Sequence, residues 1–329
     1  MAANKVILSL DIGKYDTKAM GRKLGDKVEL KTTSIRTKFY DLKNGYLDVE
    51  GDNSYSVAFE DKYVIVGEQG NEISYETSKT NDIHRICGYV AITQFIEPDT
   101  KDNEIYLVLA CPISVLKNTA TKDKYKNFIK GEGPIEITVD NKHYTFTIKE
   151  IAIKGEGSGI VYTDTDMFKN NSVAVIDLGG LNFTFSLYNN CSCNNDNRFI
   201  TEDGAFTLYR MVQDELILYK NGNLVRQDTA ILATDRGYLT KGTGKPDTDS
   251  MQYIGRAKEK YLKSILDIIK SRKFALDEVD KVVFVGGTVN KLLPEIKELD
   301  YNVFIPNEPE YATVKGLYKL AYALYGKNK

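Results

Sequence analysis

Two kinds of residue that build metal and acid–base centres are scarce in this 329-residue chain. It contains only two histidines, His84 and His143, so a histidine-rich metal site is excluded and a histidine-centred catalytic triad would have to use one of them. We interpret both as ordinary polar residues. The four cysteines lack the spacing of a zinc ribbon and are interpreted as reduced thiols: Cys87, Cys111, Cys191 and Cys193.

A surplus of positive charge and long apolar runs are also missing. Lys and Arg number 44 against 46 Asp and Glu, a formal net charge of -2, which excludes the strongly basic surface of a direct nucleic-acid binder. No window reaches the roughly 18 apolar residues that a membrane span needs. The apolar run near the N-terminus, at about six residues, is too short for a signal peptide. We therefore expect a cytoplasmic protein with no membrane partner.

The chain alternates short apolar runs, rich in Val, Ile, Tyr and Phe, with amphipathic stretches, which is the pattern of an α/β protein. Its length predicts about two domains, with a candidate boundary in the polar stretch Met167–Ser172. The expected strands are Val6–Leu10, Val28–Thr33, Ser54–Phe59, Tyr63–Val66, Ile105–Ala110, Ile135–Val139, Tyr144–Ile148, Ile151–Ile153, Val173–Ile176, Phe183–Tyr188 and Val282–Val285. The expected helices are a Lys-rich one around Tyr125–Ile129, then Phe206–Tyr219, Ser250–Ser271 and Tyr311–Tyr325, with a surface loop at Thr240–Ser250.

Three of the expected strands end in turns of the same kind. They run into Asp11–Gly13, Asp177–Gly180 and Gly286–Thr288. A glycine just past a buried strand lets backbone amides approach a phosphate, and an acidic residue at the strand end can hold a magnesium ion or its waters there. One such turn is commonplace, but three in this order and spacing predict a nucleotide site.

The two acidic turns lie half the chain apart, and each begins a strand–turn–strand unit. The expected return strands are Thr17–Arg22 after Asp11 and Phe183–Tyr188 after Asp177. Two similar halves facing each other would put both turns on opposite walls of one cleft.

These motifs together resemble the actin-like ATPase superfamily, and most closely the ParM-type plasmid-segregation actins of bacteria. Asp11–Lys18 looks like the family's first phosphate loop with its lysine, Ile176–Gly180 like the second, and Phe284–Thr288 like the adenosine motif. Pro309–Tyr318 is similar to the segment that leads into the family's closing helix. The resemblance implies an α/β, actin-like (ribonuclease H-like) two-domain fold with two related halves around a central nucleotide cleft. Residues 1–169, completed by 306–329, would form the first domain, and 170–305 the second.

The resemblance also implies ATP or ADP and Mg²⁺ as cofactors and assigns roles to residues. Asp11 and Asp177 would be catalytic and hold magnesium through its water shell, Lys18 would contact the β- and γ-phosphates, and Glu156 would orient the attacking water. Taken singly, Lys18 could be a surface lysine and Glu156 a solvated loop acid. The residues expected to contact the nucleotide are Gly13, Lys14, Tyr15, Asp16, Thr17, Lys18, Gly179, Gly180, Leu181, Asn182, Gly204, Gly286, Gly287 and Thr288.

The sequence departs from the family pattern at two places. Leu181 and Asn182 follow the second loop where the family usually has two small hydroxyl residues, so hydroxyl contacts to phosphate are not expected there. Gly155 stands where the family commonly has a proline before the glutamate or glutamine that positions water, here Glu156.

The function implied is that of an ATPase that polymerises with ATP and Mg²⁺ in the bacterial cytoplasm and segregates plasmid DNA. Its expected partners are other copies of itself and an adaptor protein bound to a centromere-like plasmid site, without direct nucleic-acid contact. Two alternatives stay open: a small-molecule kinase of the same superfamily, for which Glu156 is an equal candidate base, and a nucleotide-gated scaffold that forms no filament and does not hydrolyse ATP.

Overall fold

The computed structural model describes residues 4–25 and 30–326, and the chain divides into two compact units. Unit 1 comprises Met1–Thr165 and Tyr311–Lys329, and unit 2 comprises Asp166–Glu310. Each unit contains its own sheet with helices packed on it, which confirms the predicted α/β class. The short helix α5 (Thr165–Phe168) lies where the chain passes from unit 1 to unit 2.

Unit 1 is built on a nine-stranded sheet in the order β3-β2-β1-β7-β9-β8-β5-β6-β4. Its strands are β1 (Asn4–Ile12), β2 (Asp16–Lys23), β3 (Lys31–Arg36), β4 (Phe39–Asp41), β5 (Ser54–Phe59), β6 (Lys62–Gly67), β7 (Asn103–Cys111), β8 (Ile135–Val139) and β9 (Lys142–Gly155). Its helices are α1 (Asp82–Thr93), α2 (Ile113–Leu116), α3 (Thr119–Lys130), α4 (Gly159–Thr163) and α10 (Ala312–Tyr325). Because β1, β7 and β9 pair in parallel, their carboxyl ends meet at one edge of the sheet.

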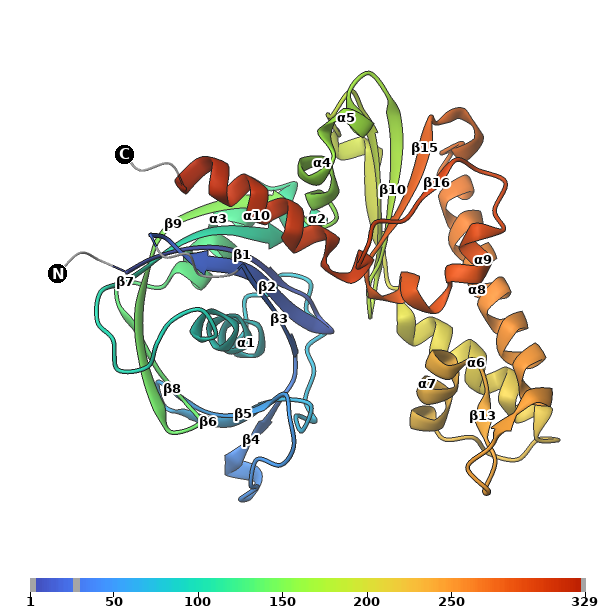
Figure 1. Ribbon diagram of the computed structural model, residues 1–329, viewed down its shortest axis with the longest axis horizontal. Helices are drawn as coiled ribbons and strands as arrows, with labels where there is room; N and C mark the ends of the chain where they lie inside the picture. Colours follow the sequence, from blue (N-terminus) through green and yellow to red (C-terminus); the bar gives the residue numbers. More distant parts are fainter. Residues whose placement is uncertain (1–3, 26–29, 327–329) are drawn as a thin grey trace. The chain divides into compact units, whose positions relative to one another are not determined.

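The alternation of side chains along β1 fills two cores on opposite faces of the sheet. Leu8 and Leu10 belong to the larger core, which also holds buried residues of α1 and α3, whereas Ile7 packs with Leu317 of α10. Ser9 also faces α10 and donates its hydroxyl hydrogen to the carbonyl oxygen of Val314, at 2.7 Å. Figure 1 shows α1 enclosed by the curving sheet and α10 lying along its outer side.

Helix α1 is the main element of unit 1 that the sequence pattern does not predict. Nearly all of its side chains are buried, including Ile86, Tyr89 and Val90. A helix enclosed on all sides lacks the polar face that makes helical periodicity visible. Its apolar run is therefore as typical of a buried strand as of a helix.

Most of the predicted strands lie within observed ones, with two differences. The prediction Val28–Thr33 falls partly outside the described residues, and the strand found there is β3, Lys31–Arg36. The two short strands predicted at Tyr144–Ile148 and Ile151–Ile153 are one strand, β9, whose pairing with β7 shifts register at Ile105 and Tyr106. This irregularity breaks the period-2 pattern, which is why one strand is predicted as two.

Unit 2 is built on a five-stranded sheet in the order β12-β11-β10-β15-β16. Its strands are β10 (Ser172–Leu178), β11 (Phe183–Asn189), β12 (Arg198–Thr201), β15 (Lys281–Val285) and β16 (Val303–Phe304). The stretch Thr240–Ser250, predicted as a loop, differs from the prediction: it contains β14 (Pro246–Asp247) and the end of β13 (Leu239–Thr240), which pair as a separate two-stranded sheet. Its helices are α6 (Ala205–Tyr219), α7 (Gln227–Arg236), α8 (Met251–Ser271) and α9 (Leu293–Lys297). The apolar stripe of α8 packs in one core with the sheet and α6, as its periodicity predicts.

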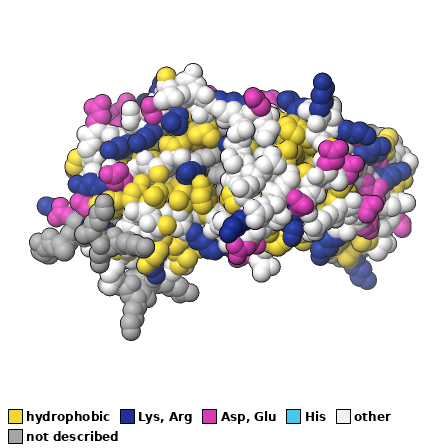
Figure 2. Space-filling model, turned by 90° about the horizontal axis from the view of Figure 1, so that it is seen from above, with side chains coloured by type: hydrophobic (Ala, Val, Ile, Leu, Met, Phe, Trp, Pro, Cys, Tyr) yellow, Lys and Arg dark blue, Asp and Glu magenta, His cyan; other side chains and the backbone are white. Residues whose placement is uncertain are grey.

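The surface carries charges of both signs. Figure 2 shows Lys and Arg side chains interspersed with Asp and Glu across the face that it presents, in keeping with the near-zero formal net charge. Within residues 4–25 and 30–326, no helix combines the length and the apolar character needed to cross a bilayer.

Candidate functional site

Parallel pairing brings two predicted site residues of unit 1 to one edge of its sheet. Asp11 lies near the carboxyl end of β1, where it pairs in register with Lys18 of β2. Glu156 follows the end of β9, and its backbone N–H donates to the carbonyl oxygen of Cys111, at the end of β7, at 2.9 Å. Because β7 lies between β1 and β9, Asp11 and Glu156 belong to the same edge although they are far apart in the sequence.

A third residue, Lys79, joins this pair and is absent from the predicted set. Its ammonium forms an ion pair with Oε1 of Glu156, and only 3% of the Lys79 side chain and 11% of the Glu156 side chain are exposed. Burial alone would lower the pKa of Lys79, but the carboxylates of Glu156 and Asp11 raise it above its ordinary value. Lys79 is therefore a buried group whose ammonium form is favoured by two acids. Its loop position gives no periodic or motif signal that sequence reasoning could have used.

The electrostatics of Asp11 follow from the same surroundings. Burial raises the pKa of Asp11 to about 6, the Lys79 ammonium opposes that rise, and Glu156 adds to it. A carboxylate held in this way is ionised at neutral pH, yet is poorly solvated. It therefore gains from a nearby cation.

The turn between β1 and β2 is closed by its own backbone. The N–H of Gly13 donates to the carbonyl oxygen of Asp16 at 3.0 Å, and a Cβ atom at Gly13 would lie 2.5 Å from that oxygen. Only glycine fits there. Lys14 is buried, and its Nζ donates to Oγ1 of Thr77 at 3.0 Å, which links the turn to the loop that carries Lys79.

Other side chains of the predicted first phosphate loop are held within unit 1. The guanidinium of Arg36 stacks 3.2 Å from the ring centre of Tyr15 and pairs with Asp16 at 3.1 Å. Thr17 is fully buried and shares a hydrogen bond with a neighbouring threonine hydroxyl. Lys18 lies with its Nζ 6.0 Å from the centre of the Tyr311 ring. The side chains of Tyr15, Asp16 and Thr17 therefore stabilise the conformation of this loop through contacts within unit 1.

In unit 2 the predicted second phosphate turn packs against the start of α6. The amides of Ala205 and Phe206 donate to the carbonyl oxygens of Gly179 and Gly180, at 3.0 and 3.1 Å. A Cβ atom on Gly204, the residue before α6, would lie 2.5 Å from the backbone nitrogen of Asn182. Close backbone packing therefore explains why residue 204 is a glycine.

The predicted adenosine motif reaches the same turn. The Thr288 hydroxyl donates to the carbonyl oxygen of Gly179 at 2.8 Å, and Gly287 begins the short 3-10 helix that carries Thr288. Gly286 has a φ of 97°, and a Cβ atom there would lie 2.6 Å from Oδ1 of Asp177. The predicted second phosphate turn and the predicted adenosine motif thus lie together at the ends of β10 and β15. The side chain of Leu181 is buried.

The residues present fit a magnesium-bound nucleotide. Mg²⁺ is usually held by one or two carboxylates together with phosphate oxygens and water, rather than by a cage of protein ligands. Across the described part of the chain no group of three or more His, Cys, Asp or Glu residues could hold a metal ion by itself. Single strand-end carboxylates beside lysines, as at Asp11, match the water-mediated mode.

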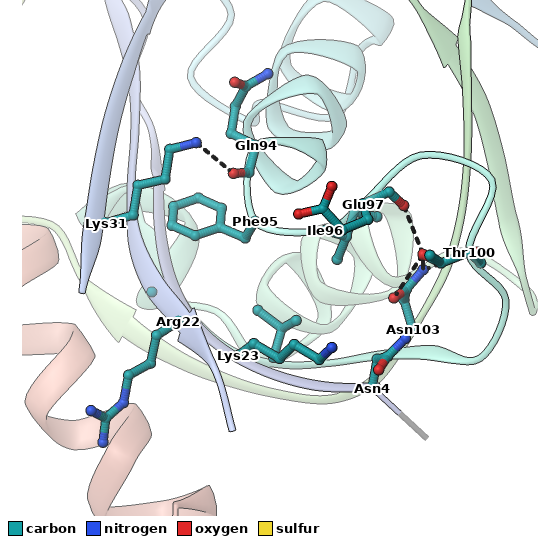
Figure 3. A pocket seen from close by; sticks show the side chains of 12 residues that line it. Asn4, Arg22, Lys23, Lys31, Gln94, Phe95, Ile96, Glu97, Thr100 and Asn103 are labelled. Atoms are coloured by element: carbon teal, nitrogen blue, oxygen red, sulfur yellow. Dashed lines mark hydrogen bonds between the residues drawn. The ribbon is translucent and has the colours of Figure 1, made fainter. Parts of the chain in front are cut away.

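A cavity of about 280 Å³ lies elsewhere in unit 1, and the described residues that line it include none of the predicted site residues. Figure 3 shows Lys31 turned toward the backbone of Gln94, to whose carbonyl oxygen it donates at 2.8 Å. Arg22 extends away from the other labelled side chains and lies over the Tyr322 ring of α10. Because these cations already have partners within unit 1, the cavity is a weak candidate for an anion site.

His84, in the first turn of α1, is fully buried. Its Nδ1 lies 2.8 Å from Oδ1 of Asn81, an oxygen that can only accept, so Nδ1 carries the proton and Nε2 does not. Burial, together with the charges of Lys79 and Lys14, lowers the pKa of His84 to about 3. The imidazole is therefore neutral in the folded protein, which its sequence surroundings do not indicate.

This buried imidazole predicts a pH-dependent stability. At pH values below 6.5, the ordinary pKa of histidine, His84 is protonated in the unfolded chain but neutral in the folded protein. A fall in pH therefore favours the unfolded chain, and the protein loses stability. Between pH 7 and pH 5 the free energy of unfolding should fall by about 2 kcal/mol through His84. In urea unfolding at both pH values, His84→Leu should lose most of that decrease, whereas His143→Leu, at an exposed position, should keep it. Equal decreases in all three proteins would contradict the assignment.

Comparisons with known proteins bear on the fold and the family of the chain. Residues 9–159 match the family described as actin like proteins N terminal domain. A search of the curated proteins found no match. Among solved structures, the chain is similar to one described as an Alp12 filament structure, at 45% sequence identity and a TM-score of 0.72, covering 98% of this chain and 99% of that one.

Two more distant structures share the fold. One is Ta0583, an archaeal actin homolog in complex with ADP, at 15% identity and a TM-score of 0.74, covering 98% of this chain and 99% of that one. The other is Bacillus thuringiensis ParM with ATP, at 15% identity and a TM-score of 0.67, covering 99% and 100%. These likenesses confirm the predicted actin-like α/β fold.

Proposed function

Because this chain belongs to the family of actin-like proteins, we propose that it binds ATP with Mg²⁺, assembles into filaments and hydrolyses the bound nucleotide. The observation that carries the proposal is the 45% identity, over nearly the full length of both chains, to a protein whose structure is that of a filament. The ADP and ATP of the more distant structures support the choice of nucleotide.

The proposed chemistry is assigned to named side chains. Bound Mg·ATP would supply the γ-phosphoryl group that is transferred to water. Asp11 and Asp177 would hold the hydrated ion, and Lys18 would offset charge on the β- and γ-phosphates. Glu156 would orient the water and accept its proton, since it lies at the sheet edge with Asp11.

We propose that the glycine-containing turns supply the remaining contacts with the nucleotide. Backbone groups of Gly13–Thr17, Gly179–Asn182 and Gly204 would approach the phosphates, and Gly286–Thr288 would face the adenine. The side chains of several of these residues are already bound within their own unit, as with Asp16 and Thr17, so their backbone is the part proposed to contact the nucleotide.

We also propose that the filament segregates plasmid DNA in the bacterial cytoplasm through an adaptor protein. The ParM relatives and the balanced charge of the chain support this role for an adaptor. A protein without a surplus of cations lacks the basic surface that binds DNA directly.

The proposal predicts nucleotide-dependent assembly. Adding ATP and Mg²⁺ to the full chain should raise light scattering and bring the protein into the high-speed pellet, and negative-stain microscopy should show filaments. Protein without nucleotide, or with EDTA, should stay in the supernatant. No pelleting over a wide range of protein and salt concentrations would refute the filament. Phosphate release no faster than that of Asp177→Ala would refute ATP hydrolysis.

A further inference from the structure

We propose that Lys79 is a positioning residue of the proposed hydrolytic site: its ammonium holds the Glu156 carboxylate in the orientation in which that carboxylate acts on water. The inference rests on the proposed ATPase function. It adds a residue outside all three nucleotide motifs, from the loop between β6 and α1.

The contact between the two side chains is shielded from water. Residue Lys79 is 2% exposed, and its ammonium donates to Oε1 of Glu156. An ammonium this deeply buried is costly unless a carboxylate compensates it. With Oε1 fixed in this way, Oε2 is the oxygen proposed to accept the proton of the attacking water.

Hydrogen bonds hold the loop in place on both sides of Lys79. Before it, Thr77 accepts the hydrogen bond of Lys14 from the predicted first phosphate loop. After it, Asn81 caps α1 and donates to the carboxylate of Glu76. Lys79 itself has a φ of 54°, a left-handed conformation that costs free energy in a residue with a side chain. A strained backbone that aims a buried cation at a predicted catalytic acid is what a positioning role requires.

The charge of Lys79 argues against a different role. Glu156 and Asp11 raise the pKa of Lys79, and its ammonium already donates to Oε1 of Glu156, so Lys79 is not assigned the role of the base. A direct contact with the γ-phosphate is the competing role. That contact would act independently of Glu156, whereas positioning acts only through it.

A double-mutant cycle on phosphate release separates the two roles. In Mg·ATP, Lys79→Met should lower kcat by about 10–100-fold and leave KM within about threefold, since misplacing a catalytic group by about 1 Å can cost 100-fold. Lys79→Arg, which keeps the charge, should lie closer to the unmodified rate. In a Glu156→Gln background, Lys79→Met should change kcat little. Lys62→Met, which removes an ion-paired lysine of β6, is the matched control and should leave kcat unchanged.

A second cycle needs no nucleotide. Lys79→Met and Glu156→Gln should each lower the thermal unfolding temperature, and the double variant should lower it by clearly less than the sum of the two shifts. Additive shifts would overturn the pairing.

The outcomes keep the inference and the proposed function apart. If the unmodified chain releases no phosphate, the proposed ATPase fails, and the role of Lys79 fails with it. If the unmodified chain is active, the inference alone is overturned by an unchanged kcat in Lys79→Met. It is equally overturned by the same loss of kcat in the Glu156→Gln background as in the unmodified one.

Discussion

Replacing Gly316 by alanine is expected to lower the free energy of unfolding by about 3 kcal/mol or more. Gly316 lies in α10 where that helix contacts α4, and a Cβ atom on it would lie 1.7 Å from the carbonyl oxygen of Gly159. Because the obstacle is backbone, it cannot rotate away as a side chain could. Relief would require α10 and α4 to move apart, and α10 is also held on β1, where Val314 accepts the hydrogen bond of Ser9.

Replacing glycine by alanine inside a helix usually stabilises a protein, whereas at Gly316 we expect the same change to destabilise it. In an unobstructed helix interior, alanine is more favourable than glycine by about 1 kcal/mol. Gly255 in α8 has open space around its Cβ position, so Gly255→Ala is the matched control and should be neutral or stabilising. Thermal unfolding followed by circular dichroism should show a midpoint lower by roughly 6–12 °C for Gly316→Ala and no loss for Gly255→Ala. A Gly316→Ala protein as stable as the original would mean that the two helices are not in backbone contact.

The second large effect is expected at Glu156. Glu156→Gln should reduce phosphate release by about 10²–10⁴-fold, because the amide keeps the shape of the carboxylate but cannot accept a proton from water. Nucleotide affinity should change little, since the acid is assigned to water rather than to phosphate. Steady-state phosphate release and the binding of a fluorescent ATP analogue measure the two quantities separately.

Glu150, an exposed acid of β9, the strand that leads into Glu156, provides the matched control. Glu150→Gln should retain the original rate. Because Glu156→Gln also removes a charge partner of the buried Lys79, its folding should be checked by circular dichroism before rates are compared. A folded Glu156→Gln protein with the original rate would show that Glu156 only neutralises Lys79.

Periodic patterns in the sequence predicted the parts of the fold that have one buried face. The amphipathic stripe of Ser250–Ser271 corresponds to α8, and the apolar run Val6–Leu10 lies within β1. Patterns failed where burial is complete or the strand is irregular, as in α1 and β9. The three glycine-containing turns could also be predicted, because glycine at a turn reflects a local requirement of the backbone.

By itself, the sequence determined the α/β class and the strand-end positions of Asp11 and Asp177, because strand periodicity and turn chemistry depend on near neighbours along the chain. Only the tertiary structure decided that Glu156, Lys79 and Asp11 share one sheet edge, and that His84 is buried beside them. Parallel pairing of β1, β7 and β9 brings two of these residues to that edge, and the loop before α1 adds the buried Lys79. The pKa values of Asp11, Lys79 and His84 depend on burial and on charges from other parts of the chain, and no local pattern records which distant residues will be neighbours.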